Sequence, residues 1–422
     1  MSGWNRILRS PVFDAAVLLI AVLHVAWIAQ ILPMRVFSFD FNNYYMPSRM
    51  IREGRDPYRT PLAEESRKYG FEYSERIPVG TNPPLLLWVF APLTLLPPRP
   101  AFWVWVAVES GSLVAILWLT KRLLKGQLTE RAWLFFFAAA LSSAPVYWNF
   151  AFAHVEMTIA ALLLAAYSWH KSGKHALACA TILLVGMIKI YPLVLLPWFV
   201  WRSGFPVRKR LLYVVTLLAG IAAIVLVTGV ARWQGFFARA MPCIKSWSVG
   251  QTFTFTLPSF VINAGEVLQR GTATAEPGRL WWDIGVSIGL ATILASYAFC
   301  AVGKKDEDVQ FSVLCGAMLA GGLTAWGYYF VILIFPVGVA TARMVESPSW
   351  RWALVFAVLL MAMNSQGPWD GFFFRWSPIG RILLNYVPLY GLLGFCFFLA
   401  KYSTATAAGQ REQPDPYSHS LR

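Results

Sequence analysis

The feature that most constrains this chain is a series of apolar runs long enough to cross a lipid bilayer. The first covers residues 11–32, PVFDAAVLLIAVLHVAWIAQIL, and is followed by PMRVF rather than by a small-residue cleavage site. It therefore predicts a retained helix and not a signal peptide. Further apolar runs lie near 101–120, 131–148, 155–170, 211–231, 281–301, 309–325, 327–342, 351–364 and 380–400. Only 14% of the residues are charged, against about 25% in soluble domains, so the runs predict an all-α polytopic integral membrane protein.

Two other apolar stretches are interrupted by proline. They are NPPLLLWVFAPLTLLPPRP (82–100) and ALACATILLVGMIKIYPLVLLPWFVW (176–201). Irregular backbone at membrane depth is tolerated where it lines a cavity, so both stretches are predicted to be re-entrant or hinged. Together with the continuous runs, and with short interfacial helices in the aromatic segments between them, they predict a bundle of about 10–13 membrane helices.

The basic residues predict the orientation of this bundle. Short segments rich in Lys and Arg fall on the side of the N-terminus, at 121–125, 170–175, 202–210, 303–305 and after 401. The positive-inside rule makes that side cytoplasmic. We therefore expect one catalytic or transport domain over residues 1–401, in the plasma membrane, with both termini cytoplasmic. A disordered cytoplasmic tail is predicted at 402–422, and extracytoplasmic loops at about 33–100, 232–280 and 365–379.

The net charge of +15 does not indicate a nucleic-acid partner. Much of the positive charge lies in the short loops between apolar runs, where it holds a protein against anionic lipid. The predicted partner of these residues is the bilayer. No metal-ligand spacing, no Asp-x-Asp pair near a small strand-rich domain and no Gly-rich phosphate loop is present, so we predict a reaction without metal or other cofactor.

The segment FSFDFNNYYMPSRMIREGRDPY (37–58) follows the first apolar run directly. Its Asp40 is either a helix cap or solvated loop acid, or a catalytic carboxylate at the mouth of a membrane cavity. We favour the second because Asp40 lies between two phenylalanines where the chain leaves the membrane. A partly desolvated carboxylate has a raised proton affinity and can act as a general base. Asp56, which precedes a proline and is expected to begin a turn, and Asp370 are the second and third candidates.

Three further side chains of this segment could bind a sugar. If residues 42–53 form a helix, Tyr45 and Arg49 lie four residues apart on one face, with Tyr44 beside them. Aromatic rings stack on sugars, and hydroxyl and guanidinium groups hydrogen-bond to them. The alternative is that these residues anchor a short helix at the lipid headgroups.

The order of motifs resembles that of glycosyltransferase family 87, the polyprenol-phosphate-mannose-dependent transferases of the GT-C superfamily. FDFNNYYMPSRMIREGRDPY is similar to the family's opening pattern of an Asp, a Tyr-rich helix and Gly-x-Asp-Pro-Tyr. NPPLLLWVFAPLTLLPPRPAFWVW resembles its Tyr-Pro-Pro segment, GMIKIYPLVLLPWFVW its Lys-x-x-Pro helix, and TAWGYYFVILIFP its late Trp-x-His-Tyr segment. The resemblance covers residues 11–400 and implies a GT-C type transmembrane bundle.

The resemblance also implies an activity. A sugar, mannose by the resemblance alone, would pass from a polyprenyl-phosphate donor to a hydroxyl of a glycolipid or cell-envelope glycan on the extracytoplasmic face. Asp40 would take the hydroxyl proton, and the anomeric carbon would invert. Lys189 matches the family's motif lysine and would face the donor phosphate. A Lys inside an apolar stretch either snorkels to the interface or has a function of this kind.

Two segments depart from the family pattern. His154 and Glu156 stand where relatives carry Gln and Asn of Gly-Gln-x-Asn. They are two residues apart and so not on one helical face, and we expect one to face the cavity while the other caps a helix or pairs with a loop arginine. Trp326, Tyr328 and Tyr329 stand where relatives often have a histidine. They are either substrate contacts or part of an interfacial aromatic belt.

Two other functions remain open at this point. A transporter or flippase of lipid-linked sugars explains the hydropathy equally well, but predicts internal repeats, and none stands out in the sequence. A non-catalytic subunit of a cell-envelope assembly would explain the departures from the family pattern. Turnover by the purified protein distinguishes both from an enzyme.

Overall fold

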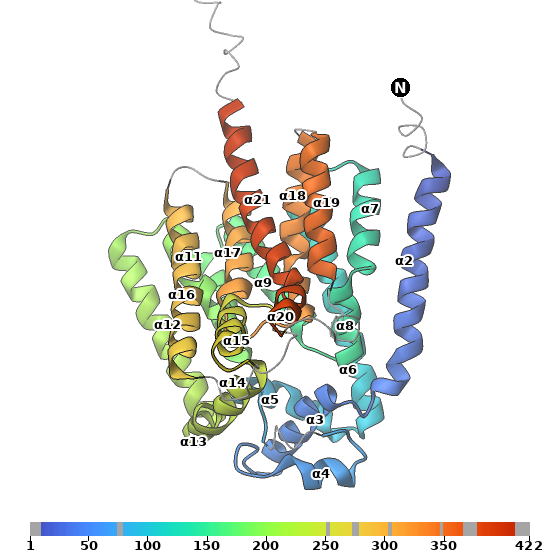
Figure 1. Ribbon diagram of the computed structural model, residues 1–422. Coiled ribbons are helices and arrows are strands. Elements are labelled where there is room, and N and C mark those ends of the chain that lie inside the picture. Colours follow the sequence, from blue (N-terminus) through green and yellow to red (C-terminus); the bar gives the residue numbers. More distant parts are fainter. Residues whose placement is uncertain are drawn as a thin grey trace, which may run out of the picture.

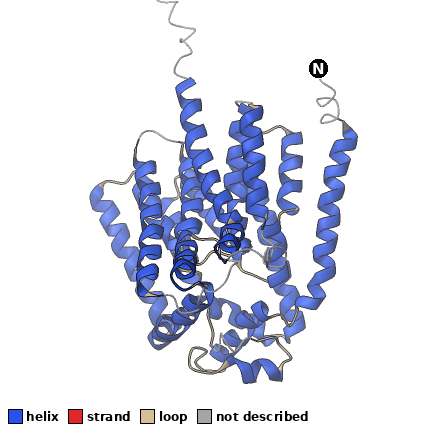
Figure 2. Ribbon diagram, in the orientation of Figure 1, coloured by secondary structure: helices blue, strands red, loops and turns tan. Residues whose placement is uncertain are grey.

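The computed structural model describes residues 10–73, 79–249, 254–271, 278–302, 306–346, 349–365 and 378–409. These residues form helices joined by loops (Figure 2), with one isolated β-bridge between Thr254 and Trp326. The predicted all-α membrane class is confirmed. The helices make up a bundle and, at one end of it, a set of short helices that we call the end layer (Figure 1).

The end layer contains the helices that lie at the lower end of the bundle in Figure 1. They are α3 (Phe39–Arg52), α4 (Leu62–Lys68), α5 (Pro84–Phe90), η2 (Ala91–Leu95), α13 (Val230–Gly235), the π-helical turn η4 (Phe236–Ala240) and α14 (Met241–Val249). A short 3₁₀ turn, η1 (Leu32–Arg35), connects α3 to the first long helix.

The bundle contains the remaining helices. They are α2 (Pro11–Ile31), α6 (Pro98–Leu123), α7 (Glu130–Leu141), α8 (Ala144–Phe152), α9 (Glu156–Lys171), α10 (His175–Ile188), η3 (Tyr191–Leu195), α11 (Leu196–Arg202), α12 (Val207–Thr228), α15 (Leu257–Arg270), α16 (Arg279–Ala301), α17 (Glu307–Gly321), η5 (Gly327–Leu333), α18 (Ile334–Glu346), α19 (Trp350–Asn364), α20 (Pro378–Asn385) and α21 (Val387–Gly409). The start of α2 and the end of α21 lie at the end of the bundle opposite the end layer (Figure 1). Which side of a membrane that end faces stays a prediction. The helix α21 continues eight residues into the predicted tail, and residues 410–422 lie outside the described residues.

Five helices in the described residues are long and apolar enough to cross a membrane, or up to seven spans if each of two bent helix pairs is one. The bent pairs are α7 with α8, at 42°, and α20 with α21, at 45°. The sequence predicts one continuous span at each of these places. Both are broken because a proline, Pro145 or Pro388, stands at the second residue of the following helix, where it cannot continue the preceding hydrogen-bond ladder.

The break predicted within 176–201 is present. The helix α10 ends at Ile188, Lys189 is extended, and the chain returns through η3 and α11, which pack against α10. Pro192 stands at the start of η3 and prevents α10 from continuing. The segment is therefore a hairpin, and its tip carries Lys189 and Tyr191.

Several bundle helices are too short to span a bilayer because they stop at a common place. The helix α9 begins at Glu156, α10 ends at Ile188, α17 ends at Gly321 and η5 begins at Gly327. Residues next to each of these four ends line the same cavity. Backbone can leave the helical state inside a membrane protein where it borders such a cavity rather than lipid.

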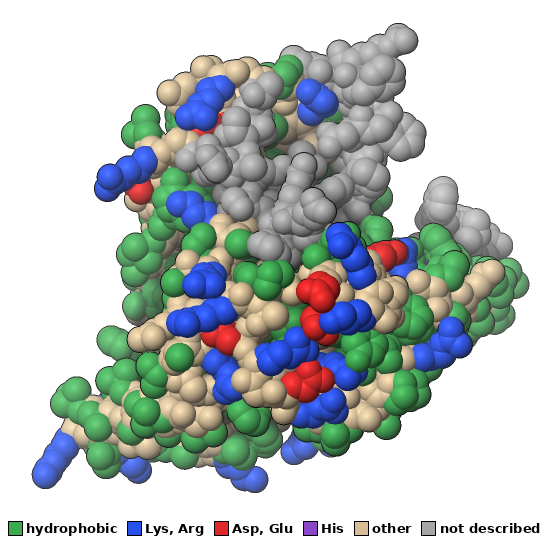
Figure 3. All heavy atoms as spheres, turned by 90° about the horizontal axis from the view of Figure 1, so that it is seen from below, with side chains coloured by type: hydrophobic (Ala, Val, Ile, Leu, Met, Phe, Trp, Pro, Cys, Tyr) green, Lys and Arg blue, Asp and Glu red, His purple; other side chains and the backbone are tan. Residues whose placement is uncertain are grey.

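The outer face of the end layer is charged. Arg55 pairs with Glu53 at 2.6 Å and with Glu65 at 3.0 Å, and Lys68 pairs with Glu64 at 3.2 Å. Seen from below, Lys, Arg, Asp and Glu side chains gather in the middle of this face, with apolar side chains toward its edges (Figure 3). An outer charged face over a buried aromatic underside is the arrangement expected of helices that lie along a membrane surface.

Candidate active site

A cavity of about 560 Å³ lies between the end layer and the bundle. From the end layer it is bordered by α3, the loop before α5, η4 and α14, and from the bundle by the helix ends that stop there. The lining residues with polar or aromatic side chains are Asp40, Asn43, Tyr44, Thr81, Asn82, His154, Lys189, Tyr191, Phe236, Phe237, Lys245, Trp282, Thr324, Trp326, Tyr328 and Tyr329. The size is within the range of small-molecule sites, which are commonly about 300–1,000 Å³.

Asp40 belongs to a chain of three polar side chains at the mouth of this cavity. Its Oδ1 lies 3.3 Å from Nε2 of His154, and Nδ1 of His154 lies 2.9 Å from the hydroxyl of Tyr44. Asp40 and Tyr44 are four residues apart in α3 and so share one face of that helix. Burial, with the charge of Glu156 next in effect, raises the pKa of Tyr44 well above its ordinary value, so this hydroxyl keeps its proton.

The Tyr44 hydroxyl is within hydrogen-bond distance of Nδ1 of His154. Nε2–H of His154 can donate to the Asp40 carboxylate, which can only accept when ionised. The His154 ring also stacks on Tyr328, with centroids 3.7 Å apart and planes at 22°. The imidazole is thus fixed in position, and it orients one oxygen of Asp40.

The backbone that carries His154 is unusual. Ala153 has φ +52°, and it alone among the described non-glycine residues has a positive φ, a conformation that costs roughly 1–2 kcal/mol for a residue with a Cβ. Two side chains of α6 hold this corner, since Nε1 of Trp105 donates to the carbonyl of Ala153 at 2.9 Å and Glu109 accepts from the hydroxyl of Thr158. Strained backbone of this kind persists where the surroundings fix it, often at functional sites.

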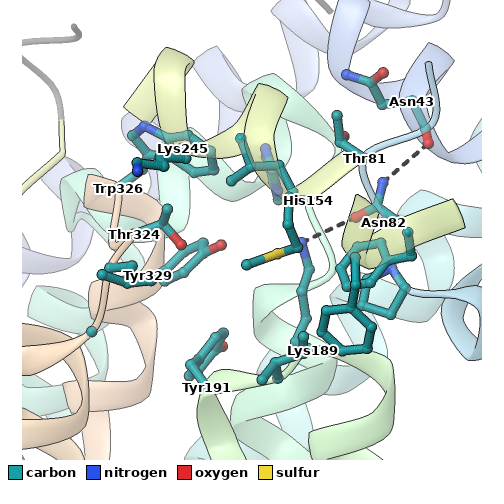
Figure 4. Close-up of a pocket in the computed structure, with 18 of the residues that line it drawn as sticks. Asn43, Thr81, Asn82, His154, Lys189, Tyr191, Lys245, Thr324, Trp326 and Tyr329 are labelled. Carbon is teal, nitrogen blue, oxygen red and sulfur yellow. Dashed lines mark hydrogen bonds between the residues drawn. The ribbon is translucent and has the colours of Figure 1, made fainter. Parts of the chain in front are cut away.

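Lys189 forms the second polar centre of the cavity. Its Nζ donates to Oδ1 of Asn82 at 3.2 Å and lies 3.8 Å from Oε1 of Glu156, which is fully buried. Asn82 in turn donates to the carbonyl of Asn43 at 3.1 Å. Figure 4 shows Lys189 rising from the hairpin tip toward Asn82, with Tyr191 and Tyr329 on the other side of the cavity. Glu156 also accepts from the Tyr191 hydroxyl.

Of His154 and Glu156, one faces the cavity and the other does not, as expected, but the ion-pair partner of Glu156 differs from the expected one. His154 lines the cavity, whereas Glu156 lies behind it and pairs with Lys189 rather than with a loop arginine. Trp326, Tyr328 and Tyr329 all line the cavity. The position of Tyr328 is fixed because Asn149 donates to its carbonyl at 2.8 Å.

Tyr45 and Arg49 do not reach the cavity. The Tyr45 hydroxyl donates to the carbonyl of Leu96 at 2.7 Å, and Arg49 pairs with Glu53 at 2.7 Å and stacks on Tyr69 at 4.4 Å. A helix turns about 100° per residue, so Tyr44 and Tyr45 cannot both follow Asp40 into the same space. Tyr45 and Arg49 instead hold α3 against its neighbours.

The other two candidate bases also differ from Asp40 in their surroundings. Asp56 accepts from the backbone N–H of Tyr58 at 2.9 Å and pairs with Arg59 at 3.4 Å. It forms the predicted turn and is not among the lining residues. Asp370 lies outside the described residues.

Nine of these polar or aromatic lining residues were not expected from the sequence: Asn43, Thr81, Asn82, Tyr191, Phe236, Phe237, Lys245, Trp282 and Thr324. Asn82 precedes Pro83 and Pro84, and Tyr191 follows Lys189 by two residues, so their proximity to recognised motifs could have indicated them. Lys245 and Trp282 lie in the long segment after α12 and at the start of α16, where no local pattern marks them.

No group of three or more His, Cys, Asp or Glu side chains that could hold a metal ion occurs in the described part of the chain.

Comparison with known proteins supplies a family. The model of Glycosyltransferase family 87 matches residues 81–326. No curated protein and no solved structure matches the chain. The matched region contains Asn82, His154, Lys189 and Trp326 and covers more than half of the sequence. This chain belongs to glycosyltransferase family 87.

Proposed function

We propose that this glycosyltransferase moves a sugar, mannose in the first instance, from a polyprenyl-phosphate donor to a hydroxyl of a glycolipid or cell-envelope glycan. The reaction takes place on the extracytoplasmic face of the membrane and inverts the anomeric carbon. The observation that carries the proposal is that a carboxylate, Asp40, and an amine, Lys189, line one cavity whose remaining wall is largely apolar and aromatic. Such a site suits a substrate with a sugar, a phosphate and a lipid tail.

Asp40 is the general base in this proposal. His154 hydrogen-bonds to its Oδ1, and no described residue hydrogen-bonds to Oδ2, which is therefore available to accept the proton of the acceptor hydroxyl. The side chain retains 21% exposure, so an acceptor hydroxyl can reach it. Proton removal of this kind contributes typically about 10²–10⁴-fold to rate.

Lys189 faces the donor phosphate. Its position at the tip of the hairpin is held by Asn82 and Glu156, so the ammonium is oriented before the donor binds. A preorganised cation costs no reorganisation when charge develops on the leaving group. Tyr44, Tyr328, Tyr329 and Trp326 line the same cavity as Asp40 and Lys189, and in this proposal they supply ring faces and hydroxyls for the sugar.

The test is sugar transfer by purified protein in nanodiscs, from radiolabelled polyprenyl-phosphate mannose to a membrane glycolipid extract. Asp40→Asn is expected to lose transfer by at least about 10²-fold while keeping the thermal unfolding profile of the wild type. Asp56→Asn is the matched control, because it removes the same charge in the end layer outside the cavity, and it is expected to retain transfer. Equal rates for wild type and Asp40→Asn would remove Asp40 as the base. No product from mannosyl or pentosyl donors would instead favour the transport hypothesis.

A further inference from the structure

The charged groups of the cavity are unequally compensated. Among the described residues that line it, those with a carboxylate, ammonium or guanidinium group are Asp40, Lys189 and Lys245. The ammonium of Lys189 lies 3.8 Å from the buried carboxylate of Glu156, which offsets much of its charge toward a ligand. Lys245 has no carboxylate within ion-pair distance among the described residues. Among the described residues it is thus the lining cation whose charge no carboxylate offsets.

The surroundings of Lys245 suit the binding of an amphiphile with a charged headgroup. Its Nζ lies 3.7 Å from the centroid of the Trp282 ring, across from it on α16. Met241 and Ile244 of the same helix and Phe237 of η4 also line the cavity. Figure 4 shows Lys245 near Trp326, on the opposite side of the cavity from Asn82. A cation beside an apolar wall can hold a phosphate while the attached hydrocarbon lies along that wall.

The change in charge during the proposed reaction favours a second cation at the phosphate. The bond between the anomeric carbon and the phosphate oxygen breaks, the acceptor oxygen bonds to that carbon, and the acceptor proton passes to Asp40. The phosphate keeps the bonding electron pair. A polyprenyl-phosphate sugar is a diester with one negative charge, whereas the departing polyprenyl phosphate is a monoester with a charge of about −1.5 to −2 near neutral pH. The leaving group therefore gains charge during transfer, and a partly neutralised Lys189 offsets only part of it.

We propose that Lys245 binds the phosphate of the departing polyprenyl phosphate and stabilises the charge that develops on it. This inference rests on the proposed function. Because the added charge exists in the transition state and product but not in the bound donor, Lys245 contributes more to turnover and product binding than to donor binding. Lys189 and Lys245 then approach the phosphate from the hairpin and from α14.

The test compares equilibrium binding of two lipids to protein in nanodiscs: a polyprenyl monophosphate, and its methyl diester, which carries one charge. Lys245→Met is expected to weaken monophosphate binding about tenfold, as for loss of a charge-assisted hydrogen bond, and diester binding by about threefold or less. Lys245→Arg is expected to restore monophosphate binding. Lys209→Met is the matched control, since Lys209 is an exposed lysine stacked on Phe205 at 4.1 Å, outside the cavity, and it is expected to bind both lipids as the wild type does.

The outcomes distinguish failure of this inference from failure of the proposed function. If Lys245→Met binds the monophosphate within about twofold of wild type, or if Lys209→Met weakens it equally, Lys245 is not the phosphate ligand, while the transferase proposal stands. If the wild type binds the monophosphate through Lys245 but transfers no sugar, the phosphate site stands and the transferase proposal fails. If the wild type binds no polyprenyl monophosphate, both are overturned.

Discussion

Replacing Glu156 by alanine is expected to destabilise this protein more than any exposed charge change. The side chain is 0% exposed, its Oε1 lies 3.8 Å from the ammonium of Lys189, and its Oε2 accepts from the Tyr191 hydroxyl. Lys189 is itself only 13% exposed at its side chain. Glu156→Ala would leave a largely buried ammonium without its counter-ion and a partly buried phenol without its acceptor. Removing one partner of a buried pair costs about 3–5 kcal/mol of unfolding free energy.

The double variant separates charge pairing from packing. Replacing both members of a buried ion pair by apolar side chains is often neutral, so Glu156→Leu combined with Lys189→Met is expected to recover most of the loss seen in Glu156→Leu alone. The double variant should nevertheless transfer sugar far more slowly, because one of the two cations proposed to face the phosphate is gone. Stability and activity would then be affected in opposite directions by the second substitution.

The measurement is unfolding by SDS titration in mixed micelles, followed by tryptophan fluorescence, with sugar transfer measured on the same preparations. Asp283→Ala is the control, because its pair with Arg279 is exposed, with side-chain exposures of 63% and 95%, and such pairs contribute about 0–1 kcal/mol. A loss below about 1 kcal/mol for Glu156→Ala, or no recovery in the double variant, would refute the assignment of Glu156 as the counter-ion of Lys189.

Two further predictions concern packing and the limits of the site. Gly289→Ala would bring a Cβ within 2.5 Å of the carbonyl oxygen of Gly321, where α16 and α17 meet; we expect a loss of about 1–3 kcal/mol, measured by the same SDS titration. Gly111→Ala, with no atom within 4 Å of the new Cβ, is its control, and an equal loss there would contradict the reasoning. Tyr45→Phe removes the hydrogen bond to the carbonyl of Leu96 and should cost about 1 kcal/mol without slowing transfer. A large fall in kcat for Tyr45→Phe would return this residue to the sugar site.

Local pattern determined the class of this protein. Apolar runs and low charge predict membrane helices without reference to any partner segment, because the cost of burying polar groups in lipid acts on each segment separately. Proline acts locally too, which is why the hairpin break near Lys189 could be predicted from its sequence. The breaks at Pro145 and Pro388 carry the same signal, and their flanking apolar residues concealed it.

The site was predictable only as separate residues. Asp40, His154, Lys189 and the late aromatic residues could each be named from charge, position or motif, but 114 positions separate His154 from Asp40, and 107 separate Lys189 from Asn82. Whether such groups meet depends on how the helices pack, and no short window of sequence contains that information.

Tertiary structure decided the roles within the site. It turned Tyr45 away from the cavity, placed Glu156 behind Lys189 as its counter-ion, and added Lys245 from a segment with no distinctive pattern. In each case the deciding quantity is the environment of a charged or polar group after packing, which fixes its partner and its burial. The sequence by itself thus determined a membrane-embedded helical chain that carries a candidate carboxylate and a candidate amine. Only the packed structure decided which of them share one cavity, because that depends on contacts between segments far apart in the chain.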